Sequence, residues 1–286
     1  MDLKSKELKA FLNANKVSTR LIGPLERHIL SRPQDTSRRT DVLHPSEIVK
    51  SDWCHRASYY VVTGKAAANK ERPGLRLQSI FDEGHAIHKK WQGYLEEMGV
   101  LYGKWYCRGC GTSSWGLPDY DTDCGPSKYH EVPLEYPPLH IAGHSDGWVV
   151  GLGEDFLIEI KSIGTGTIRM EDPSLLSEGL ESAWRNLRYP FTSHLRQGLI
   201  YLHLAALLDK DGLLERPAPK EIVFLYELKL DQSYKEFVVE YDTEPIQDVL
   251  MGIDAVVAAI NSGTPPECNI GAKGCKSCLS LEGIIK

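Results

Sequence analysis

The sequence predicts an α/β domain in which helices flank a small mixed sheet. The segments 148–150 and 155–157, which are apolar except for Asp155, enclose a Gly-rich turn and predict a strand–turn–strand unit. A helical pattern follows over 192–208, and a second pair of strands is predicted at 221–230 and 234–241. Strands that alternate with helices in this way are typical of α/β domains.

The elements before this unit are predicted in two groups. Residues 1–43 should form a short amphipathic helix at 1–16 and a basic arm, and residues 44–286 the main domain. The main domain opens with a helix whose N-cap we expect to be Ser46. An apolar stripe predicts a longer helix over 80–98, with His88 at the border of the stripe.

Residues 101–136 depart from this alternation. They are rich in Gly, Pro, Cys and aromatic residues and lack a long periodic pattern, so we expect an inserted metal knuckle. Further helices are expected at 181–187 and 244–262, and a cysteine-rich tail at 264–286 ends the chain.

Composition narrows the function classes. The 286 residues are 42% hydrophobic, which suits one large domain. No run approaches the roughly 20 apolar residues of a membrane helix, and the start lacks an apolar signal core, so we expect a cytoplasmic protein that does not contact membranes. Seven cysteines, four of them in Cys-x-x-Cys pairs, indicate metal ligands rather than disulfides. The net charge of −6 hides a basic region, because residues 1–40 carry nine Lys and Arg against four Asp and Glu.

Two acids face each other in the predicted hairpin. If residues 151–154 form the turn, Asp146 falls opposite Glu159, at a Cα separation of about 4.5–5.5 Å. Carboxylates this close repel each other unless a cation lies between them. Lys161 shares the strand face of Glu159, because side chains alternate along a strand. The sequence therefore predicts a metal-binding acid pair with an ammonium group beside it.

This arrangement resembles the PD-(D/E)XK nuclease superfamily, with Asp146 as its first acid and Glu159-Ile160-Lys161 as its (D/E)XK motif. Gly84-His-Ala-Ile-His88 is similar to the Gly-x-x-x-His helix of the RecB-like branch, and Gln197-Gly-Leu-Ile-Tyr201 to its Gln-x-x-x-Tyr helix. The resemblance covers about residues 44–280. It is strongest to the small stand-alone exonucleases of CRISPR adaptation modules and their phage relatives, and it implies a restriction-endonuclease-like core.

The resemblance also implies roles for these residues. It implies a Mg²⁺ or Mn²⁺ ion, whose ligands would be His88, Asp146, Glu159 and the main-chain carbonyl of Ile160. Lys161 would orient the attacking water or neutralise the developing oxyanion. Gln197 and Tyr201 would contact the carboxylates or the DNA strand, with helix packing as the alternative. His85 is a competing metal ligand, although His88 fits the family spacing better.

Cys54, Cys268, Cys275 and Cys278 resemble the iron–sulfur set of the same branch, with one cysteine before the nuclease core and three after it. Four thiolates can bind zinc or a [4Fe–4S] cluster, and spacing alone does not decide between them. The resemblance favours the [4Fe–4S] cluster, which would pin the C-terminus to the core.

Three cysteines then remain for a zinc knuckle in the insert, namely Cys107, Cys110 and Cys124. His130 is the natural fourth ligand, which would give a Cys₃His zinc site. Ser127 stands where a second Cys-x-x-Cys pair would end, so the fourth ligand stays open.

The predicted function is a metal-dependent DNA exonuclease acting on single strands or DNA ends, in phage or prokaryotic replication, recombination or repair. Arg185, Arg188 and Arg196 are the candidate DNA-binding residues. One alternative is a non-catalytic DNA-binding or recombination accessory subunit, which would need none of the three active-site residues. Another is a CRISPR-adaptation nuclease that trims DNA for partner proteins.

Overall fold

The computed structural model describes residues 20–33, 38–66, 73–118, 127–271 and 275–278. The helix predicted at 1–16, the residue Cys124 and the last part of the predicted tail lie outside these ranges. The chain divides into two compact units. The first is Met1–Arg38 with Asn69–His85, and the second is Arg39–Ala68 with Ala86–Lys286.

The first unit contains α2 (Ile22–Ser31) and the beginning of α5 (Leu75–Glu97). No residue of α2 is buried. Within the described ranges, no helix of either unit is both long enough and apolar enough to cross a membrane.

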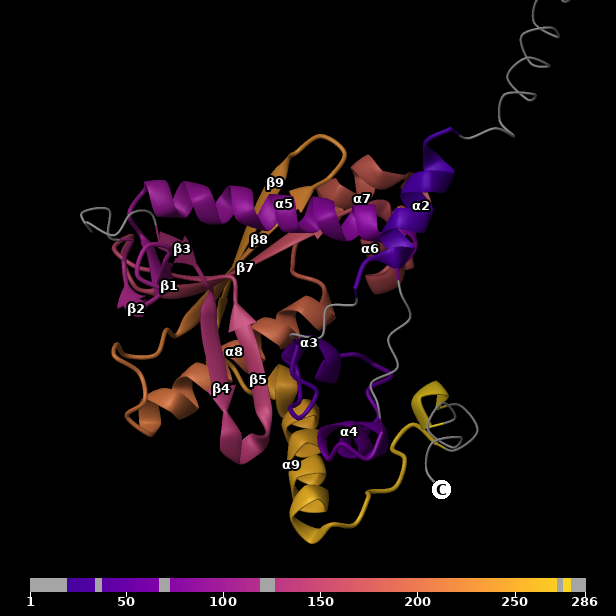
Figure 1. The fold of residues 1–286 in the computed structure, drawn as a ribbon, viewed down its shortest axis with the longest axis vertical. Coiled ribbons are helices and arrows are strands. Elements are labelled where there is room, and N and C mark those ends of the chain that lie inside the picture. Colours follow the sequence, from indigo (N-terminus) through magenta and orange to yellow (C-terminus); the bar gives the residue numbers. More distant parts are fainter. Residues whose placement is uncertain (1–19, 34–37, 67–72, 119–126, 272–274, 279–286) are drawn as a thin grey trace, which may run out of the picture. The chain divides into compact units, whose positions relative to one another are not determined.

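The second unit is built on a mixed sheet of seven described strands, ordered β2-β1-β6-β7-β8-β9, with β3 also paired to β1 (Figure 1). Its strands are β1 (Leu101–Cys107), β2 (Ser113–Gly116), β3 (Ser127–Tyr129), β6 (Gly147–Val149), β7 (Phe156–Ile163), β8 (Glu221–Leu228) and β9 (Tyr234–Glu240). Strands β7 and β8 are parallel, and the other pairs of this sheet are antiparallel. Two further strands, β4 (Val132–Tyr136) and β5 (Ile141–Ser145), form a separate antiparallel pair.

Helices occupy the long connection that a parallel strand pair requires. Between β7 and β8 the chain forms α6 (Thr165–Glu171), η2 (Pro173–Glu178), α7 (Leu180–Asn186) and α8 (Thr192–Lys210). The remaining elements are α3 (Pro45–Ile48), α4 (His55–Val62), η1 (Pro137–Leu139), η3 (Glu244–Ile246) and α9 (Gln247–Ser262).

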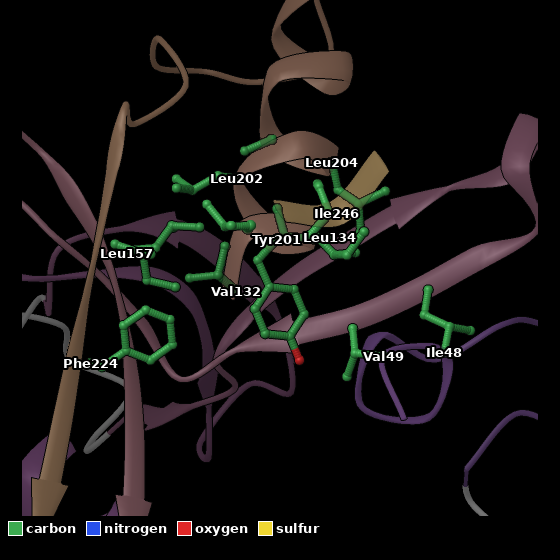
Figure 2. Packing of buried hydrophobic residues seen from close by; sticks show 14 of the residues in the cluster. Ile48, Val49, Val132, Leu134, Leu157, Tyr201, Leu202, Leu204, Phe224 and Ile246 are labelled. Atoms are coloured by element: carbon green, nitrogen blue, oxygen red, sulfur yellow. The ribbon is translucent and has the colours of Figure 1, made fainter. Parts of the chain in front are cut away.

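Strand β7 is covered on both faces, so its sequence is an apolar run interrupted by Glu159, Lys161 and Ser162. Leu157 belongs to the core shared with α8, whereas Ile158 and Ile160 pack with Ile87 of α5. Figure 2 shows Leu157 and Phe224 of the sheet beside α8. At Gly198, a Cβ atom would lie 2.4 Å from the Phe224 ring, so only glycine allows α8 to approach the sheet this closely.

The structure confirms the α/β class and the helices and strands predicted after residue 180. Ser46 as an N-cap is wrong: α3 begins at Pro45, whose fixed φ suits a first helical position, and His44 precedes it. The segment 101–136, expected to be an inserted knuckle, begins and ends with a β-strand. Its first strand, β1, pairs with β6 of the central sheet, and Val132 and Leu134 of β4 are buried in the main core.

Candidate active site

The two opposed acids lie where the chain passes from one sheet to the other. Asp146 is a single bent residue between β5 and β6. Gly147 pairs with Ile158 in the β6–β7 register, and one further step along this register sets Asp146 opposite Glu159, as the sequence predicts. The main-chain N–H of Ile160 donates a hydrogen bond to Asp146 Oδ2 at 2.6 Å, which fixes the first carboxylate against β7.

Glu159 lacks the hydrogen-bond donors that a buried carboxylate needs. Its side chain is 4% exposed, and among the described residues its Oε2 atom has no hydrogen-bond partner. Burial and the charge of Asp146 outweigh the attraction of Lys161 and raise the pKa of Glu159 to about 7. A divalent cation would supply the missing partner, so the donor set fits an oxygen-binding metal.

Lys161 lies on the same strand face as Glu159. Its Nζ atom donates to Glu159 Oε1 at 2.6 Å and to Gln197 Oε1 at 3.0 Å. Burial opposes the charged ammonium, but the charges of Glu159 and Asp146 outweigh burial and raise the pKa of Lys161. The lysine is therefore held as a cation beside the acids.

Gln197 joins this lysine to the core. Its Nε2 atom donates to the Tyr201 hydroxyl at 3.0 Å, one turn further along α8. The Tyr201 ring lies in the main core (Figure 2), and a Cβ atom at Gly143 would come within 2.8 Å of it. Gln197 therefore orients Lys161, whereas Tyr201 supports Gln197 from within the core.

His88 reaches the site from α5. Its Nδ1 atom lies 3.1 Å from Asp146 Oδ1. Burial would lower the pKa of His88, but the hydrogen bond and charge of Asp146 and the charge of Glu159 raise it. His85 belongs to the first unit. Within the second unit, His88 is thus the histidine that lies against Asp146, and its role as a metal ligand stays a prediction.

A buried acid on β8 anchors this part of α5. Glu227 is 2% exposed, and its Oε2 atom accepts hydrogen bonds from Lys90 Nζ at 2.5 Å and Trp91 Nε1 at 2.6 Å. These donors follow His88 by two and three residues. Breaking such a buried pair is costly, so the contact holds His88 in place against the sheet.

Glu131 is a third acid of the site that the sequence analysis missed. Its backbone is left-handed, with φ of 57°, an uncommon conformation for a residue other than glycine. Gln92 donates to the main-chain oxygen of Asp146 at 2.9 Å and lies 3.5 Å from Glu131 Oε1. Burial, followed by the charge of Asp146, raises the pKa of Glu131 to about 7. The signal was hidden because this position follows His130 in the segment assigned to the zinc knuckle.

The second constellation brings Cys54 together with three distant cysteines. The sulfur atoms of Cys54, Cys268, Cys275 and Cys278 all lie within 4.8 Å of one another. Cys54 Sγ is 3.4 Å from Cys278 Sγ and 3.8 Å from Cys268 Sγ. Burial raises the pKa of Cys54 to about 11, so a bound cation is needed to hold this residue as a thiolate. These four cysteines can bind a metal.

Hydrogen bonds also join the segment around Cys54 to the segment that carries Cys268. Asn269 accepts from the main-chain N–H of His55 at 2.9 Å and donates to the main-chain oxygen of Trp53 at 3.0 Å. A Cβ atom at Gly252 of α9 would lie 2.5 Å from the Trp53 ring. The segment before α4 is thus fixed to both α9 and the tail.

The zinc residues are described in part. Cys107 is the last residue of β1 and Cys110 lies in the turn that follows, where the Gly111 N–H donates to the Cys107 carbonyl at 3.0 Å. Cys107 pairs with Ser127 in the β1–β3 register. The His130 ring contacts Tyr106, on the opposite face of this strand pair, so the geometry does not favour His130 as a ligand with Cys107. The zinc site stays a prediction, since Cys124 lies outside the described residues.

The predicted DNA-binding arginines differ in their surroundings. Arg185 and Arg188 are exposed at the end of α7 and just beyond it. Arg196 is partly buried on α8 and forms an ion pair with Asp248 of α9 at 3.2 Å. Arg185 and Arg188 are therefore better placed to meet a phosphate than Arg196.

Comparison with known proteins gives no family. No family model and no curated protein matches this sequence. Among solved structures, the chain is similar to a protein designated SSO0001, with a TM-score of 0.37 and 12% identity over 89% of this chain and 91% of that one. It is also similar to an alkaline exonuclease (LHK-Exo) from Laribacter hongkongensis, with a TM-score of 0.42 and 15% identity over 79% and 90%. The structure of the same exonuclease in complex with dAMP matches with a TM-score of 0.39 and 14% identity, over 78% of this chain and 90% of that one. With TM-scores below 0.5, these likenesses assign neither a family nor a function to this chain.

We predict that Glu131→Gln makes the metal-free protein more stable at pH 8 and leaves its stability at pH 5 nearly unchanged. The folded-state pKa of Glu131 lies above its ordinary value, so the folded state binds more protons between about 4.5 and 7 and loses stability as the pH rises through that window. The gain should be on the order of 1–2 kcal/mol at pH 8, after discounting for screening by water.

Chemical denaturation at both pH values measures this difference. Glu236→Gln, at an exposed position of β9, is the matched control and should change stability by less than about 0.5 kcal/mol. An equal effect of Glu131→Gln at pH 5 and pH 8 would contradict the assignment of a strained buried charge.

Proposed function

We propose that this protein is a nuclease that hydrolyses DNA phosphodiester bonds with the help of a divalent cation. One observation carries the proposal: a buried carboxylate with an unpartnered oxygen, Glu159, lies opposite a second acid and beside a fixed ammonium group. A structural hairpin would gain nothing from this arrangement, because a buried carboxylate oxygen without a hydrogen-bond donor costs free energy.

The chemistry follows from where the groups lie. A Mg²⁺ or Mn²⁺ ion held by Asp146, Glu159, His88 and the carbonyl of Ile160 would acidify a water molecule and stabilise charge on the phosphate. Lys161 is fixed between Glu159 and Gln197 and stays charged, so its ammonium orients the attacking water or offsets the negative charge of the phosphate.

A non-catalytic DNA-binding or recombination accessory subunit is the rival. Binding alone requires basic and aromatic groups, and it does not require Lys161 to be held by two separate acceptors. The acid pair would also repel a phosphate unless a cation were bound. The geometry of the acids and the lysine therefore supports catalysis over binding alone.

The substrate and setting rest on the sequence resemblance. It supports an exonuclease that acts on single-stranded DNA or DNA ends, in phage or prokaryotic replication, recombination or repair. A CRISPR-adaptation role, in which the nuclease trims DNA for partner proteins, is the second setting that the resemblance supports.

We propose that the four-cysteine site holds a [4Fe–4S] cluster. The support is the order of the cysteines along the chain, with one before the core and three after it, as in the family that the sequence resembles. The short sulfur separations support a second candidate, a single zinc ion. With Zn–S bonds of about 2.3 Å, tetrahedral geometry puts thiolates about 3.8 Å apart, close to the 3.8 Å between Cys54 and Cys268. In either case the role is structural, because the site joins residue 54 to residue 268 and beyond.

Lys161→Ala should lower the single-turnover cleavage rate of labelled single-stranded DNA by about 10²–10³-fold, as expected for loss of a charge-stabilising group. DNA binding in the absence of cleavage should remain, since it depends on basic side chains and falls with salt. Lys220→Ala, at an exposed lysine before β8, is the matched control and should cleave like the wild type. Wild-type rates in Lys161→Ala would show that the active site lies elsewhere.

Protein purified without oxygen should be brown and contain about four iron and four sulfide per chain. Cys54→Ser should lower the iron content and the sulfide content. It should also lower the thermal unfolding midpoint, because it removes the link between residue 54 and the C-terminal cysteines. Cys110→Ser, in the turn between β1 and β2, is the control and should keep its iron. Colourless protein that loses zinc on Cys54→Ser would replace the cluster with a single ion and retain the closure.

A further inference from the structure

A histidine–tyrosine contact, between His194 and Tyr226, lies at the strand next to the one that carries Lys161. Lys161 of β7 pairs with Tyr226 of β8 in the parallel register. Two side chains of α8 cover this pair. Gln197 accepts from Lys161, and one turn earlier His194 Nδ1 lies 2.6 Å from the Tyr226 hydroxyl. The imidazole is therefore placed on the same face of the sheet as the acids and the lysine.

The contacts of Tyr226 decide where the imidazole carries its proton. The main-chain N–H of Phe191 donates to the Tyr226 hydroxyl at 3.0 Å. Among the described residues the other partner of this hydroxyl is His194 Nδ1, and we infer that the hydroxyl donates its proton to this atom, which satisfies both contacts with one hydrogen each. An imidazole whose Nδ1 accepts a hydrogen bond carries its proton on Nε2.

The neutral form of the ring is favoured by its surroundings. Burial, with the charge of Lys161 as a second cause, lowers the pKa of His194 well below its usual range. Burial raises the pKa of Tyr226 far above its usual range, so this hydroxyl keeps its proton. The nearby acid Glu171 accepts a hydrogen bond from Ser193, the residue before His194.

The ring is also fixed in orientation while remaining partly exposed. It packs edge-on against Phe191, with centroids 5.7 Å apart, and against Tyr226, with centroids 5.4 Å apart. Just before Phe191 in the chain, Arg188 is exposed and Tyr189 is 78% exposed. The side chain of His194 is itself partly exposed and its Nδ1 atom is taken up by Tyr226, so the Nε2–H group is the one left to meet a ligand.

We propose that His194 is a substrate-binding residue that donates its Nε2–H to a non-bridging oxygen of the DNA phosphate next to the one cleaved. This inference rests on the proposed nuclease function. A neutral donor suits this position, because it binds a phosphate without adding a second positive charge beside Lys161. By holding the neighbouring phosphate, His194 sets which phosphodiester lies over the acids.

Two substitutions separate the two ring nitrogens. In His194→Gln the side-chain amide group can take the place of Nε2–H, and in His194→Asn it can only take the place of Nδ1. On single-stranded DNA, His194→Asn should lower kcat/KM by about 10–100-fold, as for a lost hydrogen bond to a charged group, and His194→Gln should recover most of this loss. His203→Asn is the matched control. His203 lies further along α8 and makes a similar 2.7 Å contact with the Tyr241 hydroxyl, and the variant should cleave DNA at the wild-type rate.

A substrate change tests the contact itself. A neutral methylphosphonate at the neighbouring linkage should slow the wild type by about tenfold and slow His194→Asn little further, because the contact is already lost. Equal methylphosphonate penalties in both proteins would overturn the proposal, as would equal losses in His194→Gln and His194→Asn. Nitrogen-15 spectra of the wild type give a readout without cleavage, and a proton on Nδ1 of His194 at neutral pH would also overturn it.

The outcomes separate this inference from the function on which it rests. A wild-type protein that does not cleave DNA with Mg²⁺ or Mn²⁺ would defeat both. A wild type that cleaves, with His194→Asn as active as His203→Asn, would defeat the His194 contact and leave the nuclease function standing.

Discussion

Two carboxylates held side by side without enough hydrogen-bond donors are the constraint on which the rest of this site depends. Asp146 cannot turn away from β7, because the Ile160 N–H holds one of its oxygens. Glu159 is buried, and one of its oxygens has no partner among the described residues. Lys161 is the one hydrogen-bond donor to Glu159 among the described residues, and burial still raises the pKa of this acid, which supports the proposed cation site.

The surrounding elements keep this unfavourable arrangement in place. Glu227 fixes the part of α5 that carries His88, and Gln197 fixes Lys161 from α8. A metal bound by the cysteine cluster would tie residue 54 to residue 268. Closing a loop of this length is worth up to roughly 5 kcal/mol if it behaves like a disulfide. Stability gained by closure and core packing can offset the strain stored at the acids.

The sequence was sufficient to predict the structure where the residue pattern was local or the chemistry of the residues was specific. Alternation and a Gly-rich turn predicted that Asp146 opposes Glu159, and helical spacing predicted that Gln197 and Tyr201 share a face. The segment 101–136 could not be resolved, because Gly, Pro and Cys hide the alternation of β1 and β4. Glu131 was missed for the same reason: only the tertiary fold carries it next to Asp146. The contact of His194 with Tyr226 also depends on the packing of α8 against β8, which no local pattern reveals.

Manganese binding to the metal-free site tests the central claim most directly. Electron paramagnetic resonance counts free Mn²⁺ during titration at pH 8, in wild-type protein and in Glu159→Gln, with the cysteine cluster left intact in both. The account predicts that the wild type binds a Mn²⁺ ion and that Glu159→Gln, which removes the charge but keeps the shape, weakens binding by at least about tenfold. Equal affinity in the two proteins would contradict the claim that the opposed carboxylates exist to hold a cation.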